Sequence, residues 1–222
     1  MNFARSFRLA RASSLALPLL LLLLGGCTNP FKPADPEPPS GDVIFEDFGS
    51  IQSMLNTMAT GIATRSTNGA NAYLHAFAES TTAGDRAFRA FHDPAVKAAW
   101  LAGSNGQGAP EPWTRPNELG LHSELSRIRP NDPYLFFWLP DQGSGNDEDI
   151  GTDVTLIHRK YQLKAYPVNS NEVLIVSGFA DMLVQKAGGR YSIFEWRDRV
   201  DPDYGVSSVD VRCFTFERLE SQ

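Results

Sequence analysis

The feature that most constrains the fold is a change in hydrophobic period near the middle of the chain. Up to about residue 128, apolar side chains recur every three or four residues, the spacing of one face of an α-helix. From Tyr134 onward they alternate, the spacing of one face of a β-strand. Helices followed by strands predict an α+β domain, with the helices packed on one face of a strongly curved antiparallel sheet.

Four helices are predicted in the first half. The longest covers residues 43–65 with Asp42 as its N-cap, and the others cover residues 72–78, 94–101 and 116–128. Asp93 precedes Pro94, the usual order of an N-cap and a first-turn proline. Five strands are predicted in the second half, over residues 134–139, 154–165, 173–185, 191–200 and 206–219. Short turns between the longer runs predict antiparallel neighbours.

The composition allows a packed core and excludes several classes of protein. The 222 residues are 42% apolar and 21% charged, which excludes a disordered, collagen-like or coiled-coil chain. The length suits one domain with a tail. A formal charge of -6 argues against nucleic-acid binding through a basic surface.

The N-terminus has the pattern of a secretory signal peptide over residues 1–26. Residues 1–14 hold three arginines and no acid, and the apolar run of residues 15–24 is too short to span a bilayer about 30 Å thick. Leu24-Gly25-Gly26-Cys27 resembles the lipobox of bacterial lipoproteins, which implies lipidation of Cys27 and cleavage before it. The alternative is an ordinary signal peptide with a chance cysteine.

Residues 27–42 are predicted to be a membrane tether. Residues 28–40 contain five prolines, which favour an extended polyproline II spacer. The alternative is that these prolines form a ligand for an SH3-type domain, which an exported location disfavours. The mature chain would be acidic, so acyl chains on Cys27, rather than a basic patch, would hold it to the membrane. We expect the periplasmic face of the outer membrane rather than the inner membrane. Cys213, left without an intramolecular partner, is expected in the core.

Several segments together resemble the NTF2-like (SnoaL-like, cystatin-like α+β cone) superfamily, particularly its small exported bacterial lipoproteins. These are Tyr73-Leu74-His75-Ala76-Phe77, the Phe88 and Phe91 pair, Trp113 with Glu118, and Ser192-Ile193-Phe194-Glu195-Trp196-Arg197-Asp198. The resemblance covers residues 43–219 and implies a bent sheet wrapped around helices, with a conical pocket. It leaves function open, since such domains include isomerases, cyclases and dehydratases as well as binding proteins.

An acid–base enzyme on this scaffold would need a carboxylate or histidine facing the pocket. The candidates are Asp181, His158 and His122, with His75 as a further helical histidine. The alternation along its strand places Asp181 among apolar neighbours as a half-buried carboxylate. The alternative, which we favour, is that a bulge or the rim of the sheet lets Asp181 reach water or pair with Arg197 or Arg212. His122 is more typical of a hydrogen-bonded core histidine than of a catalytic one.

Aromatic side chains are the candidates for lining an apolar pocket: Trp113, Trp138, Phe179 and Trp196. The loop of residues 141–153 is rich in acids and glycines, but it lacks the EF-hand order, so a solvated hairpin loop is the default and calcium binding stays open. No zinc, P-loop, Rossmann or GxSxG motif is present, and no metal or cofactor is expected.

The sequence therefore predicts a membrane-anchored exported domain that binds a small apolar ligand or a protein partner of the cell envelope and has no catalytic role. A homodimer through the sheet is a further expected partner. The alternative is a SnoaL-like enzyme, an isomerase, cyclase or dehydratase that uses a pocket Asp or His.

Overall fold

A computed structural model describes residues 44–79, 86–103, 111–128, 134–141, 143, 145–166, 173–204 and 212–221. Contacts divide the chain into Met1–Gly41 and Asp42–Gln222, and every described residue belongs to the second unit. The predicted signal peptide, Cys27 and the tether lie outside the described residues. In the described part of the chain, no helix combines the length and apolar content needed to cross a membrane.

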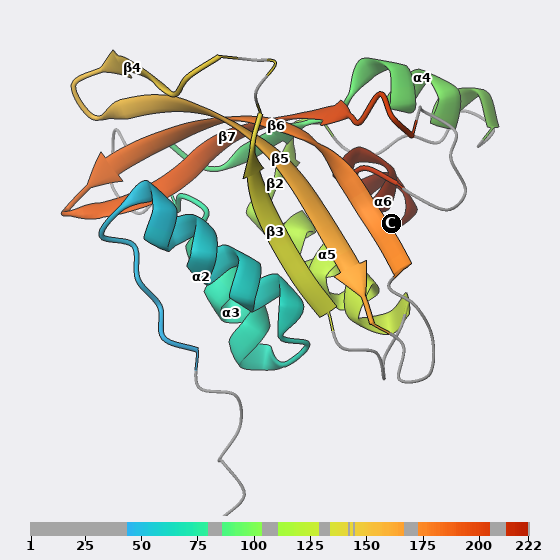
Figure 1. The fold of residues 1–222 in the computed structure, drawn as a ribbon, viewed down its shortest axis with the longest axis horizontal. Helices are drawn as coiled ribbons and strands as arrows, with labels where there is room; N and C mark the ends of the chain where they lie inside the picture. The colour runs from blue at the N-terminus through green and yellow to red at the C-terminus, as the bar shows by residue number, and fades with distance from the viewer. Residues whose placement is uncertain are drawn as a thin grey trace, which may run out of the picture. The chain divides into compact units, whose positions relative to one another are not determined.

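Within the described residues, every helix except the last precedes the long strands, as the hydrophobic periods predict (Figure 1). The helices are α2 (Ile51–Ala63), α3 (Thr67–His75), α4 (Pro94–Gly103), α5 (Arg115–Ile128) and α6 (Phe214–Glu220). The strands are β1 (Arg89–Phe91), β2 (Trp113–Thr114), β3 (Tyr134–Pro140), β4 (Glu148–Gly151), β5 (Val154–Ala165), β6 (Val173–Ala187) and β7 (Arg190–Val200). The predicted α+β class is confirmed.

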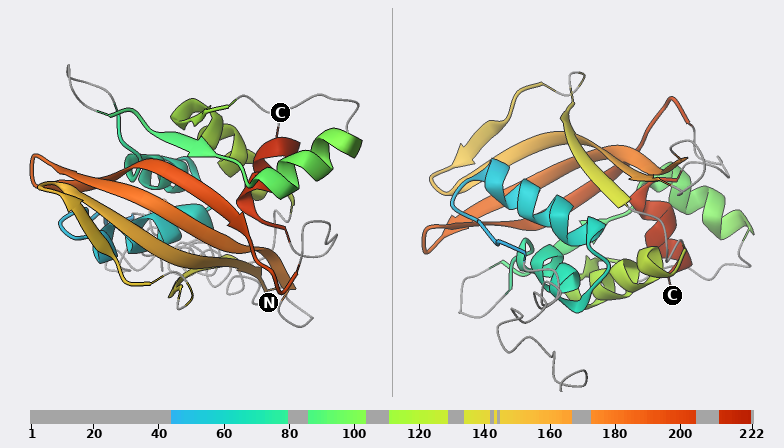
Figure 2. Two further views of the ribbon diagram at one scale, coloured as in Figure 1. Left: turned by 90° about the horizontal axis from the view of Figure 1, so that it is seen from above. Right: turned by 60° about the horizontal axis from the view of Figure 1, so that its bottom comes forward.

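The strands form one sheet in the order β2-β1-β7-β6-β5-β3, with β4 paired to β5. The long strands β5, β6 and β7 are antiparallel and twist across one another (Figure 2). A two-residue turn joins β6 to β7 at Gly188 and Gly189, whose φ angles of 57° and 80° favour glycine. The expectation of a wholly antiparallel sheet is wrong at one pairing, because β1 runs parallel to β7.

Strand parity separates a core face of the sheet from an outer face. In β6, Val176, Ala180, Met182 and Val184 are buried, whereas the odd-numbered Phe179, Asp181 and Leu183 are partly exposed. Apolar side chains of α2, α3 and α5 join the buried set in one hydrophobic core, so the helices cover the core face. A bulge in the β6–β7 pairing places Ile193, instead of Phe194, on the face of Trp196.

The first helix starts later than predicted. It begins after Ser50, whose hydroxyl accepts a hydrogen bond from the Ser53 amide, while the Ser53 hydroxyl accepts one from the Ser50 amide. This reciprocal capping box ends the extended segment before it, so Phe45 remains exposed although its spacing fits the helical face. The predicted cap Asp42 lies outside the described residues. The Asp93 cap is confirmed, since Asp93 Oδ1 accepts from the amides of Ala95 and Val96.

The predicted strand over residues 206–219 is wrong at its C-terminal end. Arg212 makes a single bridge with Val176, and α6 begins at Phe214. Thr215 explains the change, because its amide and hydroxyl both donate to Asp198 Oδ2, over 2.5 Å and 2.7 Å. These bonds attach the first turn of α6 to the core face of β7. Residues 206–211 lie outside the described residues.

Candidate ligand-binding cleft

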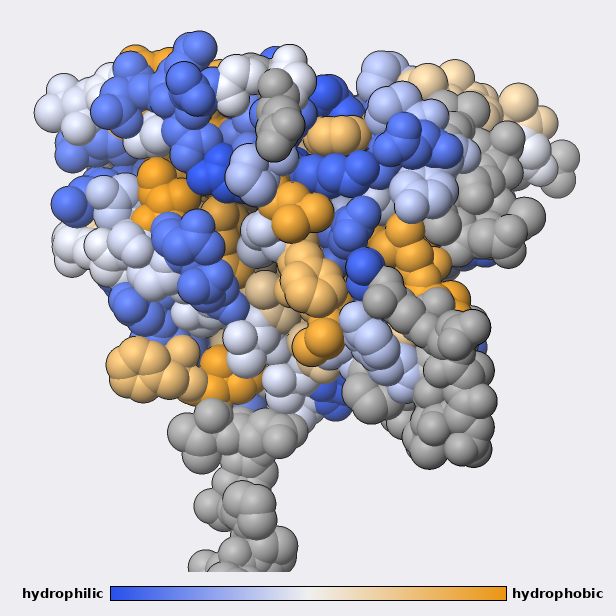
Figure 3. All heavy atoms as spheres, in the orientation of Figure 1, coloured by the Kyte–Doolittle hydropathy of each residue, from blue (hydrophilic) through white to orange (hydrophobic). Residues whose placement is uncertain are grey.

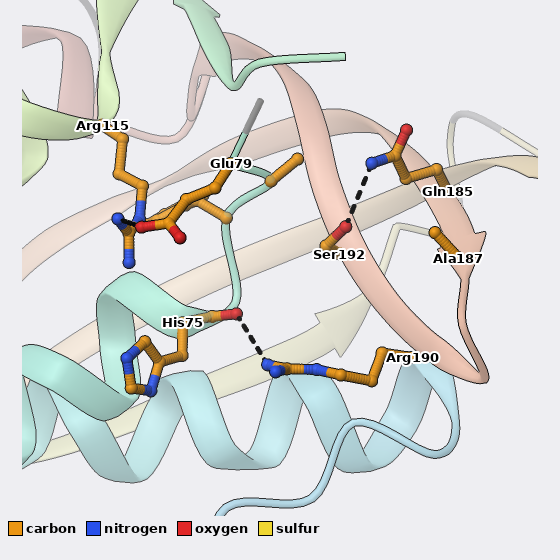
Figure 4. Close-up of a pocket in the computed structure, with 9 residues that line it drawn as sticks. His75, Glu79, Arg115, Gln185, Ala187, Arg190 and Ser192 are labelled. Atoms are coloured by element: carbon orange, nitrogen blue, oxygen red, sulfur yellow. Dashed lines mark hydrogen bonds and ion pairs between the residues drawn. The ribbon is translucent and has the colours of Figure 1, made fainter. Parts of the chain in front are cut away.

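The polar half of the candidate site is a cavity of about 330 Å³ where the end of α3, the start of α5 and the β6–β7 hairpin meet (Figure 4). Its lining combines charged and hydrogen-bonding groups with small side chains: His75, Phe77, Ala78, Glu79, Arg115, Gln185, Ala187, Arg190 and Ser192. The β6–β7 turn and the C-terminal end of α3 fix where these side chains lie.

The apolar half is a neighbouring cavity of about 530 Å³, lined by Leu74, Ala78, Glu79, Ala87, Phe88, Thr114, Arg115, Pro116 and Leu119. The two cavities share Ala78, Glu79 and Arg115, so we treat them together as the cleft. Both volumes fall in the range of about 300–1,000 Å³ typical of small-molecule sites. Leu119 is 46% exposed and lines this cavity, whereas Leu121 on the same helix is fully buried.

Arg115 stands between the two halves of the cleft. Its Nε donates to the Leu74 carbonyl over 3.0 Å, and its Nη1 forms an ion pair with Glu79 (Figure 4). Partial burial lowers the pKa of Arg115 from its ordinary value, which leaves it charged at neutral pH. The pair with Glu79 holds this charge beside the apolar half.

Arg190 reaches into the polar half from the start of β7 and points toward the main chain of His75 (Figure 4). Its guanidinium stacks over the Phe48 ring at 4.4 Å, and Nη2 makes a long hydrogen bond of 3.5 Å to the His75 carbonyl. Among the described residues, no carboxylate forms an ion pair with Arg190. The His75 ring is held by Glu46, with Nδ1 2.8 Å from Oε2.

The polar groups of the cleft differ in charge and in hydrogen-bonding role. Its titratable groups Glu79 and His75 each face an ionic partner, and most of the polar groups that line it are hydrogen-bond donors. The described charged side chains on its wall are two arginines and one carboxylate, an excess of one positive charge in a chain whose formal charge is -6.

Two of the predicted catalytic candidates meet on the outer face of the sheet. His158 and Asp181 pair across β5 and β6, with Nδ1 2.7 Å from Oδ1. Asp181 also accepts from Arg199 Nε and Nη2, over 2.9 Å and 3.0 Å. The expected partners Arg197 and Arg212 are therefore wrong, because the side chain of Arg199, two residues beyond Arg197 on the same face, reaches back to Asp181. Neither His158 nor Asp181 lines the cleft.

His122 is buried on α5, where its Nε2 lies 3.1 Å from the Gly61 carbonyl. Burial lowers the pKa of His122 from its ordinary value, so the ring is neutral at pH 7. This is the hydrogen-bonded core histidine that the sequence favoured.

The four aromatic pocket candidates do not share one cavity. Trp113 and Trp196 are fully buried, and Trp138 packs against Trp196 with ring centroids 5.7 Å apart. Phe179 lies on the outer face, near Lys160 Nζ at 5.2 Å and Arg199 Cζ at 5.4 Å. None of the four lines either half of the cleft.

The interior between α5, α6 and the sheet holds two buried polar groupings. In one, Arg218 Nε donates to Glu118 Oε1 over 2.7 Å, and the Tyr73 hydroxyl donates to Glu118 Oε2 over 2.8 Å. In the other, Asp198 accepts from the Tyr161 hydroxyl over 2.6 Å. Burial raises the pKa of Asp198, whereas nearby Arg218 lowers it. These polar groups lie where α6 fills the interior, and they hold the helix in place.

The acidic loop directs its carboxylates toward basic and hydroxyl partners. Asp147 binds Arg159 through both oxygens, over 2.5 Å and 2.7 Å, and Asp141 pairs with Arg199 at 2.8 Å. Asp149 accepts from the Thr155 hydroxyl over 2.8 Å. Over the part of the chain that the structure describes, no three His, Cys, Asp or Glu side chains group as metal ligands.

Strand β3 carries an apolar stripe along the outer face, visible as orange spheres near the centre of Figure 3. Leu135 and Leu139 are 47% and 39% exposed, and Lys164 Nζ lies 5.5 Å from the ring centroid of Phe137 between them. We call Leu135, Phe137 and Leu139 the β3 stripe.

No family model matches the sequence, and no curated protein matches it significantly. The chain is similar in structure to a protein provisionally called a scytalone dehydratase from Novosphingobium aromaticivorans, at 10% identity over 72% of this chain and 89% of that one, with a TM-score of 0.46. It is also similar to an NTF-2 like protein of unknown function from Shewanella oneidensis, at 11% identity over 67% and 94% of the chains and a TM-score of 0.40. A cystatin-like fold domain from Nostoc punctiforme gives 8% identity over 68% and 75%, with a TM-score of 0.42.

These structural neighbours are NTF2-like and cystatin-like fold proteins, the fold class that the sequence resembles. At these identities and TM-scores the likeness concerns the fold alone, and it says nothing of what the chain binds.

The sequence did not identify Arg115 or Arg190 as site residues. Arg115 precedes Pro116, where the predicted helix began, although proline in the first turn allows the helix to start one residue earlier. Arg190 follows Gly188-Gly189, a hairpin signal that places the next side chain beside the turn. Neither signal indicates that the two arginines meet at one cleft.

Proposed function

We propose that this domain binds a small ligand in the cleft without converting it, and that it does so at the bacterial cell envelope, anchored through lipid on Cys27. The observation that carries the binding proposal is the cleft itself, in which an apolar half and a polar half join at Arg115. The lipobox-like Leu24-Gly25-Gly26-Cys27 supports the anchor.

A bulky side chain in the cleft tests the binding. Ala87 is exposed and lines the apolar half, so Ala87→Trp should block the cleft without disturbing the core. Ala99→Trp, at an exposed position of α4, is the matched control. Calorimetry with the full-length chain in lipid nanodiscs should show binding of eight-carbon amphiphiles to the wild type and the control and none to Ala87→Trp. Equal binding by the two variants would exclude the cleft.

The anchor is tested separately. Cys27→Ser should abolish incorporation of a labelled fatty acid in a bacterial host and leave an unprocessed precursor. A variant that is still labelled and shortened would show that lipidation does not occur at Cys27.

The alternative, a SnoaL-like acid–base enzyme, is favoured by one observation, the 2.7 Å pairing of His158 with Asp181. A carboxylate at Nδ1 orients a histidine and leaves Nε2 to exchange a proton. If a ligand extracted with the protein is converted by the wild type and not by His158→Asn, the enzyme proposal replaces the binding one.

A protein partner is supported by the β3 stripe. A second copy docked through the outer face of the sheet would bury these exposed apolar side chains. Leu135→Lys should then change a dimer into a monomer in light scattering, whereas Ala99→Trp should not.

A further inference from the structure

We propose that the ligand of the cleft is an anionic amphiphile, with an acidic head group bound at Arg190 and an apolar chain along Leu74, Phe88 and Leu119. This inference rests on the proposed binding function and goes further by naming the chemical class of the ligand. The acidic group is a carboxylate or a phosphate, and the apolar part is a chain or ring that fills the larger cavity.

The charge of the polar half indicates an acidic head group. Arg190 has five N–H donors. Among the described residues one of them has a hydrogen-bond acceptor, the His75 carbonyl at the long distance of 3.5 Å. Phe48 supports one face of the guanidinium at 4.4 Å, which fixes its plane while leaving its edge for a ligand. A planar guanidinium with unused donors matches the two oxygens of a carboxylate or phosphate.

Neutral donors add to this preference. The Gln185 amide and the Ser192 hydroxyl both line the polar half, 3.5 Å apart (Figure 4). At that distance their mutual hydrogen bond is weak, so both can turn toward an anionic oxygen. A cationic head group would instead meet two arginines against the single carboxylate Glu79, which is already paired with Arg115.

The lining of the apolar half indicates an apolar chain on the same ligand. Leu74, Ala78, Phe88, Pro116 and Leu119 form most of its wall, and Leu119 remains 46% exposed. Burying such a surface favours an apolar chain by about 25 cal/mol for each Å² removed from water. Because Ala78, Glu79 and Arg115 line both cavities, a single molecule can place its head in one half and its chain in the other.

The test compares three ligands with the same chain and different heads: octanoate, octanol and octylammonium. Each is titrated into the full-length protein in phosphatidylcholine nanodiscs at pH 7, with empty nanodiscs as the blank. We expect octanoate to bind at least tenfold more tightly than octanol, and octylammonium to bind more weakly than either. Arg190→Gln should reduce octanoate binding to the level of octanol and leave octanol unchanged.

Two further variants sharpen the result. Arg197→Gln is the matched control, since Arg197 lies on the same strand, is largely exposed and pairs with Glu195 outside the cleft. Glu79→Gln should tighten octanoate binding, because it frees Arg115 from its carboxylate. Nanodiscs that include phosphatidylglycerol separate the sources of the anion: competition from these discs indicates a membrane lipid, and its absence indicates a free amphiphile.

The outcomes distinguish this inference from the proposed function. Octanol binding as tight as octanoate binding, or equal octanoate binding by Arg190→Gln and Arg197→Gln, would overturn the anionic head group while leaving a ligand-binding cleft. If Ala87→Trp changed the binding of none of the three ligands, the cleft function would fail together with this inference.

Discussion

At the scale of the residue, the buried polar side chains of α6 show how this core accommodates charge. Arg218 is fully buried but has Glu118 as its partner, with Trp196 4.8 Å below its guanidinium. Glu217 is 2% exposed, and among the described residues its Oε2 has no hydrogen-bond partner. Arg218 has a close ionic partner, whereas Glu217 has Arg212 only at 3.9 Å, so the two should respond differently to substitution.

Glu217 should make stability depend on pH. The pKa of Glu217 is raised to about 7, mainly by burial and also by nearby Glu220 and Glu124, while Arg212 at 3.9 Å opposes the rise. A carboxyl whose pKa is raised by folding stabilises the native state when protonated, so stability should fall as pH rises from about 4.5 to 7. Glu217→Gln should gain up to about 3 kcal/mol at pH 8 and little at pH 4.5.

Urea unfolding of the wild type and Glu217→Gln across this pH range measures the effect. Glu148→Gln, at an exposed position of β4, is the control and should follow the wild type. Parallel pH profiles for the wild type and Glu217→Gln would contradict the prediction.

Trp196 and Asp198 share the core face of β7 and both are buried. Trp196→Ala should cost about 3–5 kcal/mol, the usual loss for a buried large aromatic side chain. Asp198→Asn should cost less, about 1–3 kcal/mol, because its new amide group faces donors from Tyr161 and Thr215. Neither change should alter binding in the cleft, which neither residue lines. A Trp196→Ala protein of unchanged stability that lost its ligand would contradict this structural role.

At the scale of the element, the sequence predicts long regular segments well and short ones poorly. Strands β5, β6 and β7 each repeat the alternation many times, and their observed bounds differ from the predicted ones by no more than two residues. Helix α6 has seven residues, and its Phe214-Thr215-Phe216 start alternates like a strand. What decides its structure is Asp198, sixteen residues earlier in sequence than Phe214, and no local pattern encodes that contact.

The candidate site likewise depends on contacts between distant segments, which local sequence patterns do not predict. Cavities depend on where side chains from α3, α5, β6 and β7 meet; of the aromatic pocket candidates, the three tryptophans pack in or against the core and Phe179 lies on the outer face instead. Gly178 illustrates this, because a Cβ at that position would overlap the Tyr161 hydroxyl that holds Asp198. The sequence shows a glycine in a strand, but only the structure shows what occupies the space.

The ion pair between α5 and α6 gives a prediction at this scale. Arg218→Met should cost about 3–5 kcal/mol, because it leaves Glu118 buried without its cation. The double variant Arg218→Met with Glu118→Gln should be more stable than Arg218→Met alone, since the charge is removed while Tyr73 keeps an acceptor. Urea unfolding of the two single variants and the double variant gives the coupling energy. Additive costs would show that the two side chains do not stabilise one another.

At the scale of the whole molecule, the described residues form one packed unit around a hydrophobic core. Met1–Gly41 and Asp42–Gln222 are separate contact units, and a single hydrophobic core runs from Phe48 to Leu219. Cys213 is buried within this core as a free cysteine. The core packing and the buried polar groups around it are the sources of stability that the described residues show.

The last prediction concerns protein expressed from Gly41 to Gln222. It should be soluble and unfold in one cooperative transition, because Asp42–Gln222 contains the complete core described here. Burial raises the pKa of the Cys213 thiol well above its ordinary value, so the reactive thiolate is scarce at neutral pH and the thiol has no disulfide to exchange. Calorimetric melting should therefore be the same with and without a thiol reductant.

Cys213→Ala should lower stability somewhat, through the volume lost from the core, and should also be insensitive to reductant. A melting transition of the wild type that disappears on adding reductant, while that of Cys213→Ala does not change, would show that Cys213 forms a bond on which folding depends.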